Sequence, residues 1–354
     1  MRGVSVDVFV CAGCGAELTA PVSRVALPVH THQHWGHDLL PALMQPGTYA
    51  VDLEPSGPPW RLWNEIDPDE AAARGVFAPV AALSFGSPGA SVVAPGDIRG
   101  TVLIPERCDG YCLGLDGRDG PNLACARCGR PVATRIDDCS FRQAVWLAPD
   151  AVRRLPTGNP VDPPVSWDAL AAEPGTPPVE PYGGWSARWE AAAGAALAHL
   201  LAASGGRRVV LADSLNPYFL GRGLDALLPP GQPDKRAALA GPGLPGSAPD
   251  IALVPVHPVT GAVWQPPDGG EVVPLAAEVW SYLAFPYEEF PLPATGGLPA
   301  GFFQDYPRPL HPIFPFRPDN EVFLHTLSRL PAVRAPWLRQ IHTRAYARPS
   351  AYPF

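Results

Sequence analysis

Cys11-Ala12-Gly13-Cys14-Gly15 and Cys125-Ala126-Arg127-Cys128-Gly129 are two stretches that nearly copy each other within a chain of 354 residues. In each stretch two thiols stand three positions apart, and the glycine that follows can adopt the positive φ of a tight turn at no steric cost. A tetrahedral structural zinc ion needs four ligands, and two such turns supply four thiolates. The alternative is a set of ordinary buried thiols. We therefore predict that zinc is the cofactor and that its ligands are Cys11, Cys14, Cys125 and Cys128.

Both stretches resemble the knuckles of zinc ribbons, and the resemblance extends over residues 8–18 and 122–135. It implies a β-ribbon closed by a four-thiolate zinc ion, with residues 15–124 inserted between its two halves. A structural zinc ion adds to the free energy of folding and links distant parts of a chain. The resemblance thus implies an N-terminal, β-rich, zinc-ribbon-like domain that depends on its metal.

Three further cysteines and a histidine-rich stretch form a second candidate metal site. Cys139 follows two aspartates, and four of the nine histidines lie between residues 30 and 37. On a β-strand, alternate histidines would share one face and could bind zinc, nickel or copper. The alternatives are structural thiols, a hydrogen-bonded polar loop, or a grouping in which Cys112 and Cys139 join the pair Cys125 and Cys128. The candidate ligands are Cys108, Cys112, Cys139, His30, His32, His34 and His37.

The histidine stretch is similar to the His-x-His-x-Asp-His signature of metallo-β-lactamase-type hydrolases. His34 stands where that signature has its aspartate, and Trp35 stands where it has its last histidine. The resemblance implies a catalytic metal site, for which Asp38 is the nearest acidic residue.

Residues 186–284 resemble the order of elements in the restriction-endonuclease-like core. Glu190 lies on an expected helix, Asp250 opens a hairpin, and Glu278 lies on the next expected strand. The resemblance implies a Mg²⁺ site held by Asp250 and Glu278, with Trp280 at the position of the lysine that helps to activate water.

The distribution of residue types predicts an α+β protein with two domains. All seven cysteines lie between residues 11 and 139, and the 48 prolines and 35 glycines favour loops and extended segments. The expected parts are a cysteine-rich zinc-binding β domain over residues 1–154, a linker over 155–182, an α/β domain with a small mixed sheet over 183–330, and an arginine- and aromatic-rich tail over 331–354.

Apolar periodicity and capping residues predict the elements within these parts. In the first part we expect one helix, N-capped by Asp67 and ended by Gly75, and strands over residues 4–10, 24–29, 48–53, 101–104 and 144–147. After residue 155 we expect helices over 166–172, 186–203, 216–228 and 320–330, strands over 208–212, 251–256, 261–264 and 272–283, and a loop over 229–249.

The net charge of −8 disfavours nonspecific attraction to nucleic acid or anionic lipid. The arginines after Glu321, interleaved with aromatic residues, would suit phosphate contact and base stacking, but the favoured interpretation is that they pair with the acidic remainder of the chain. No apolar run is long enough for a signal peptide or a membrane span, so we expect a cytoplasmic protein without a membrane partner.

The sequence contains no complete catalytic constellation. The favoured function is therefore that of a zinc-binding scaffold with a protein partner. The alternatives are a metal-dependent hydrolase that uses the histidine stretch or the Asp250 and Glu278 pair, and a nucleic-acid-binding protein that uses the knuckles and the arginine-rich tail.

Overall fold

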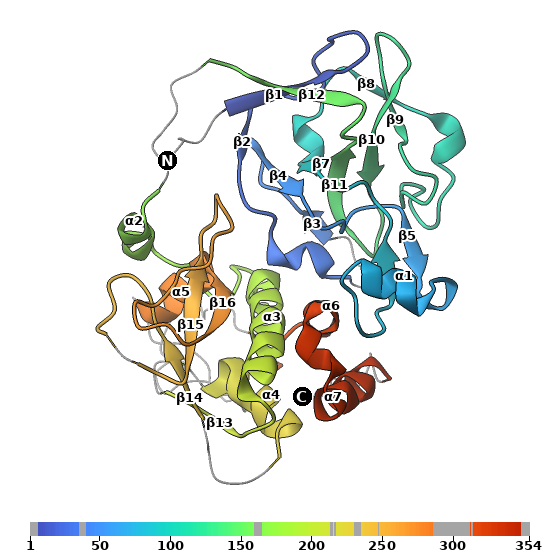
Figure 1. Ribbon diagram of the computed structural model, residues 1–354. Helices are drawn as coiled ribbons and strands as arrows, with labels where there is room; N and C mark the ends of the chain where they lie inside the picture. The colour runs from blue at the N-terminus through green and yellow to red at the C-terminus, as the bar shows by residue number, and fades with distance from the viewer. Residues whose placement is uncertain are drawn as a thin grey trace. The chain divides into compact units, whose positions relative to one another are not determined.

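The computed structural model describes residues 6–34, 40–158, 165–212, 215, 217–229, 235–246, 248–285, 312 and 314–347. The described chain divides into two compact units. Figure 1 colours the chain by residue number, from blue at the N-terminus to red at the C-terminus. Unit 1 comprises the residues up to Asp67, together with 81–165 and 259–261, and unit 2 comprises 68–80, 166–258 and the residues from Ala262 onward. Unit 1 contains a large curled mixed sheet and unit 2 a separate parallel sheet with helices, so the α+β class is confirmed.

Ten strands of the described residues form the sheet of unit 1, in the order β12-β1-β2-β4-β7-β11-β10-β9-β8, with β3 beside β11. Neighbours run antiparallel except for the parallel pairs β2–β4 and β3–β11. The strands are β1 (Val6–Cys11), β2 (Val22–Arg24), β3 (Leu40–Ala42), β4 (Thr48–Asp52), β7 (Ala90–Val93), β8 (Thr101–Leu103), β9 (Leu123–Cys125), β10 (Pro131–Ile136), β11 (Arg142–Leu147) and β12 (Val152–Pro156). A separate hairpin pairs β5 (Trp60–Leu62) with β6 (Ala82–Ser84).

Both faces of the central strands of unit 1 are buried. Because successive side chains on a strand point to opposite faces, Tyr49 of β4 and Val145 of β11 belong to one apolar cluster, whereas their neighbours Ala50 and Trp146 belong to another. The first cluster also contains two of the predicted zinc ligands, Cys11 and Cys125. This apolar cluster therefore packs against Cys11 and Cys125, two thiols of the candidate metal centre.

Unit 2 is built around a four-stranded sheet in the order β13-β14-β15-β16, in which all pairs are parallel. Its strands are β13 (Val209–Leu211), β14 (Lys235–Leu239), β15 (Ile251–Val256) and β16 (Glu271–Ala276). Its helices are α1 (Pro68–Ala73), α2 (Trp167–Ala172), α3 (Ala187–Ser204), α4 (Pro217–Leu227), α5 (Ala277–Ala284), α6 (Asn320–Arg329) and α7 (Pro336–Tyr346).

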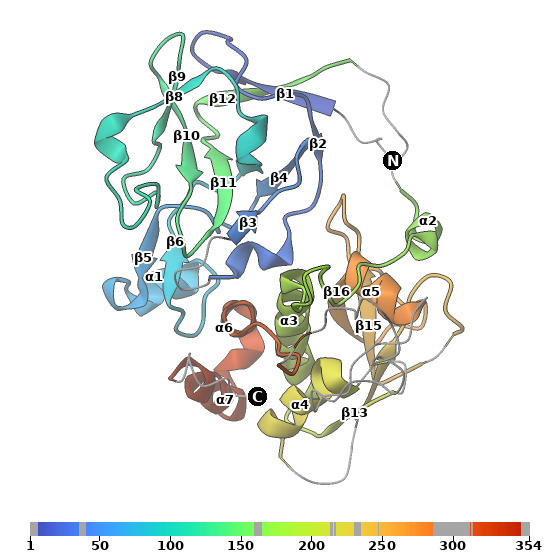
Figure 2. The ribbon, with the colours of Figure 1, turned by 180° about the vertical axis from the view of Figure 1, so that it is seen from behind.

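Helix α3 is the centre of unit 2. Figures 1 and 2 show it beside the parallel sheet, with α6 and α7 following one another nearby, and it packs against β15, β16 and α6. Most of its alanines are buried, and small side chains allow neighbouring elements to approach closely. At Gly194, an added Cβ would meet the carbonyl oxygen of Asp319 well inside van der Waals contact, so only glycine fits there.

The predicted helices 166–172, 186–203, 216–228 and 320–330 are confirmed as α2, α3, α4 and α6 within a few residues. The helix expected between Asp67 and Gly75 is also present as α1, and it belongs to unit 2. The strand predictions 4–10, 48–53, 101–104, 144–147, 208–212 and 251–256 correspond to β1, β4, β8, β11, β13 and β15.

Four predictions of local structure are wrong. The small sheet is parallel, not mixed, because β15 pairs in parallel with both β14 and β16, and β14 lies in the segment 229–249 for which the sequence predicts a loop. The expected strand 272–283 is instead β16 followed by α5, since Val279, Trp280 and Leu283 recur at helical spacing and are all buried. Of the expected strand 24–29 only Arg24 lies in a strand, as the last residue of β2, and residues 29–32 form a 3₁₀ helix. The segment 261–264 contributes only an isolated bridge, between Val256 and Val263.

Two longer segments also differ from expectation. Residues 15–124, expected as an insertion in a ribbon, contribute β2, β3, β4, β7, β8 and β9 to the same sheet as the knuckles. Within residues 331–354, expected as a tail, α7 buries Leu338, Ile341 and Ala345 in the apolar core of unit 2. The apolar residues of α7 recur at three- and four-residue spacing, which gives it one buried face.

Candidate metal centre

The two knuckles adopt the same turn at the ends of two strands. Strand β1 ends at Cys11 and strand β9 ends at Cys125. The N–H of Gly15 donates to the Cys11 carbonyl at 2.9 Å, and the N–H of Gly129 donates to the Cys125 carbonyl at 2.8 Å. The two glycines have φ values of 73° and 72°, a conformation that residues with a Cβ adopt at a cost. The glycines in the two motifs thus serve the purpose that the sequence predicts.

The four thiols of the knuckles converge on one point. Their Sγ atoms all lie within 4.8 Å of one another. The shortest distances join the knuckles to each other: 3.6 Å from Cys11 to Cys128, and 3.6 Å from Cys14 to Cys125. Four sulfurs bound tetrahedrally to zinc at ~2.3 Å would stand ~3.8 Å apart. All four cysteines are free thiols, and their spacing is that of ligands around a shared ion.

The pKa values of two thiols in the cluster show how a bound cation would change their ionisation. Burial would raise the pKa of Cys11, but the backbone N–H groups of Cys14 and Gly13 and the neighbouring thiols lower it to about 7. The Arg130 N–H lowers the pKa of Cys128, but hydrogen bonds to the neighbouring thiols outweigh it and raise that pKa to about 11. The Cys11 thiolate therefore forms readily, and a metal ion bound beside it would favour the thiolate form of Cys128 as well.

The cluster also joins two ends of the large sheet. Strand β1 lies next to one end of the strand order, and β9 lies next to the other. Beside the cysteines, backbone bonds make the same connection: the N–H of Arg99 donates to the Leu18 carbonyl at 2.8 Å, and Thr19 forms a bridge with Ile98. Cys11 and Cys125 have no exposed surface, whereas Cys128 is exposed. The centre thus lies at the rim of the core, where the curled sheet closes.

Of the other candidate cysteines, Cys112 and Cys139 come together and Cys108 does not. The thiols of Cys112 and Cys139 and a carboxylate oxygen of Asp138 lie within 4.8 Å of one another. The thiol of Cys108 instead donates to the Ile104 carbonyl at 3.1 Å. The sequence shows two aspartates before Cys139, but its pattern alone does not single out Asp138 as a ligand.

The predicted histidine cluster does not form a metal site in the described residues. Residues 29–32 form a 3₁₀ helix, so the alternation expected for a strand is lost. A ring nitrogen of His30 lies 3.3 Å from the Leu43 carbonyl oxygen. His34 packs edge-on against Phe141 at 4.8 Å between ring centroids, and burial lowers its pKa to about 4. No group of potential ligands among the described residues contains His30, His32 or His34, and His37 and Asp38 lie outside those residues.

The nuclease-like pair is also not brought together. Asp250 precedes β15 and Glu278 follows β16, so the two carboxylates lie at opposite ends of two neighbouring parallel strands, each six residues long. Six residues of parallel strand span ~20 Å. A carboxylate oxygen of Asp250 accepts the Arg236 N–H at 2.7 Å, and Glu278 forms an ion pair with Arg188 at 3.7 Å. The predicted pair is wrong because Glu278 lies in the first turn of α5 and not on a strand.

Several arginines of the C-terminal segment make contacts within unit 2. Arg339 donates to the carbonyl oxygens of Phe77 and Val333, and the guanidinium of Arg334 lies 4.1 Å from the centre of the Phe77 ring. These contacts place both side chains against the fold. These contacts are intramolecular, but their partners are carbonyl oxygens and an aromatic ring, not the acidic residues that the alternative expects.

Helices among the described residues are too short or too polar to cross a membrane. Comparison with protein-family models, with curated proteins and with solved structures found no significant match. The interpretation of the site therefore rests on its own geometry.

Proposed function

We propose that the chain is a cytoplasmic zinc-binding protein in which Cys11, Cys14, Cys125 and Cys128 hold a structural zinc ion. The observation that carries the proposal is the convergence of four thiols, from two matching turns far apart in the sequence, within 4.8 Å. A set of four sulfur ligands suits zinc, and it fills a tetrahedral coordination sphere. No position is then left for water or substrate, so this ion has a structural role.

The zinc ion stabilises unit 1, and unit 1 acts as a scaffold that binds a protein partner. Unit 1 offers an edge strand, β8, which pairs only with β9 among the residues that the structure describes. On this strand Val102 is 52% exposed and Leu103 is 48% exposed. Edge strands with exposed apolar side chains invite pairing with another chain. The closure of the sheet by zinc would fix the shape of this edge.

The test is the zinc content and stability of the purified full chain in three forms. The double variant Cys14→Ser/Cys125→Ser removes one ligand from each knuckle, and Cys108→Ser changes a thiol that lies outside both clusters. The double variant is expected to contain about one zinc ion fewer per chain than the wild type, and to unfold at lower denaturant concentration. Cys108→Ser is expected to match the wild type in both measurements. Equal zinc content and stability in all three forms would refute the proposal.

A further inference from the structure

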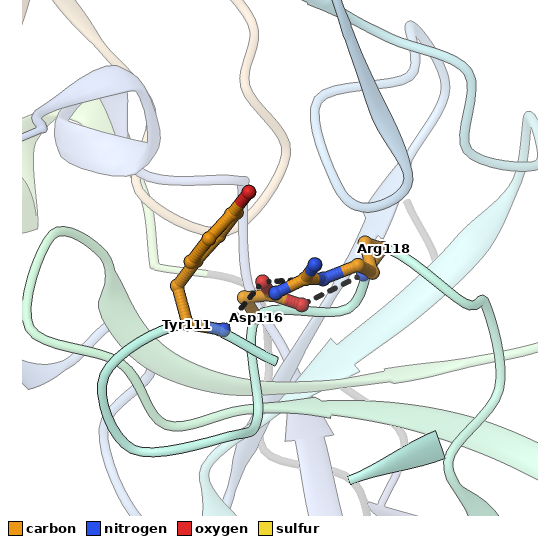
Figure 3. A network of polar contacts seen from close by, with 3 residues as sticks. All are labelled: Tyr111, Asp116 and Arg118. Atoms are coloured by element: carbon orange, nitrogen blue, oxygen red, sulfur yellow. Dashed lines mark hydrogen bonds and ion pairs between the residues drawn. The ribbon is translucent and has the colours of Figure 1, made fainter. Parts of the chain in front are cut away.

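The loop from Cys108 to Arg118 is held by a polar network centred on Asp116, shown in Figure 3. One carboxylate oxygen of Asp116 accepts the Tyr111 N–H at 3.2 Å and the Arg118 Nε–H at 2.9 Å, and the other accepts the Arg118 N–H at 3.1 Å. The Arg118 guanidinium lies 4.1 Å from the centre of the Tyr111 ring. These contacts fix both ends of a short exposed turn that carries Cys112.

Cys112 has an unusual backbone conformation within this turn. Its φ is 52°, and it is the only residue other than glycine with a positive φ among the described residues. Hydrogen bonds from the N–H of Gly114 to the Tyr111 carbonyl and from the N–H of Gly110 to the Gly114 carbonyl close the turn. A left-handed conformation costs a residue with a Cβ about 1–2 kcal/mol. Glycine would avoid this cost, so the position carries a thiol at the expense of stability.

The turn places the Cys112 thiol beside two potential ligands from the segment that follows β10. The N–H of Asp137 donates to the Leu115 carbonyl at 2.9 Å, which attaches this segment to the loop. Asp138 is 5% exposed, and one of its carboxylate oxygens accepts the Cys139 N–H at 2.6 Å. The two thiols and the carboxylate lie within 4.8 Å of one another. A buried carboxylate beside two thiols is a set of donors that suits a divalent cation.

We propose that Cys112, Asp138 and Cys139 form a second zinc site, independent of the four-cysteine centre, whose fourth coordination position takes an exchangeable water molecule. Three protein ligands leave one position of a tetrahedral ion open, as in zinc sites that bind water or substrate. Cys112 is exposed, so the open position has access to solvent. Water bound to zinc is more acidic than bulk water. The site therefore offers a Lewis acid that the closed four-cysteine centre does not.

The decisive variant is Cys112→Gly, because it removes the thiol and at the same time suits the positive φ of the turn. We expect this variant to lose about one zinc ion per chain, relative to a wild type that holds about two, while its thermal midpoint in the zinc-free form stays equal or rises. Cys139→Ser is expected to lose the same ion. The matched control Cys108→Ser is expected to keep both ions.

Cobalt substitution tests the open position. With Co²⁺ in the full chain, the second site is expected to show a weaker sulfur-to-metal charge-transfer band than the four-cysteine centre, because it has two sulfur ligands. Imidazole should alter the part of the visible spectrum that disappears in Cys112→Gly and leave the remaining part unchanged. These measurements are independent of the test of the four-cysteine centre. The double variant Cys14→Ser/Cys125→Ser should keep the part of the cobalt spectrum that imidazole alters.

Two results would overturn the proposal. One is an unchanged zinc content in both Cys112→Gly and Cys139→Ser. The other is a disulfide between Cys112 and Cys139, detected by mass spectrometry in protein prepared with zinc and a reductant, since an oxidised pair cannot supply two thiolates.

Discussion

At the residue scale, the two knuckles depend on glycines that follow each second cysteine. Gly129 has a φ of 72°, and an added Cβ would meet no atom within 4 Å. The variant Gly129→Ala should therefore destabilise the protein by about 1 kcal/mol, through backbone strain alone. The matched control is Gly96→Ala, where a Cβ also has open space and no positive φ is required. Urea unfolding of zinc-loaded protein compares the two, and equal midpoints would contradict the prediction.

The same scale shows which site residues a sequence can reveal. The four-cysteine set was found because each half is a local pattern, with two thiols and a glycine in five residues. Asp138 was not chosen, because its approach to Cys112 depends on the path of the Cys108–Arg118 loop. The histidine stretch was misread because its spacing implies a shared face only on a strand, and residues 29–32 form a 3₁₀ helix.

At the scale of elements, the contact between α3 and α6 depends on Gly194. Replacement of glycine by alanine inside a helix ordinarily raises stability by about 0.5–1 kcal/mol. Here the new Cβ would clash with the Asp319 carbonyl oxygen and approach the Phe323 nitrogen, so the two helices would have to move apart. We expect Gly194→Ala to lower the free energy of unfolding by about 1–3 kcal/mol. Chemical denaturation measures the change, and any increase in stability would show that the helices do not approach as described.

The first turn of α3 also carries Glu190, whose pKa is raised to about 8 by burial and by the nearby Asp319. The unfolded chain releases this proton near pH 4.5, whereas the folded chain holds it until about pH 8. The folded state therefore loses stability as the pH rises through this range. Glu190→Gln removes the titration, so its stability advantage over the wild type should grow between pH 5 and pH 8.

Urea unfolding of both proteins at pH 5, 6.5 and 8 measures that difference. The comparison between the two proteins cancels the contributions of histidines that titrate in the same range. A constant difference across the three pH values would contradict the raised pKa.

The elements themselves were predicted best where local signals agree. Helix α3 begins after the cap residue Ser186, continues through an alanine-rich run, and ends at Gly205 in the left-handed conformation. The prediction of a single strand over 272–283 is wrong because the segment changes from strand to helix. Its branched residues favour a strand at the start, and the helical spacing of Ala277, Trp280 and Leu283 begins only in its second half. Strand β14 was missed because its partners, β13 and β15, come from other parts of the sequence.

At the scale of the whole molecule, composition predicted an α+β protein but not how the large sheet closes. All seven cysteines fall in unit 1, and the residues between the knuckles supply most of its strands. The apolar pattern of the strands does not reveal that β1 and β9 approach, since they stand near opposite ends of the strand order. The thiols were the one signal of that approach, because four ligands of one ion must converge wherever they lie in the chain.

This closure predicts that removal of zinc affects one unit and not the other. The four thiols all belong to unit 1, whereas the largest apolar core belongs to unit 2. Calorimetry of the zinc-loaded chain should resolve two transitions, and a strong chelator should lower one of them by roughly 10 °C or more. Gly194→Ala, which acts within unit 2, should lower only the other transition. If chelation and Gly194→Ala shift the same transition, the metal does not stabilise unit 1 separately. If chelation shifts neither transition, the ion contributes nothing to the closure of the sheet.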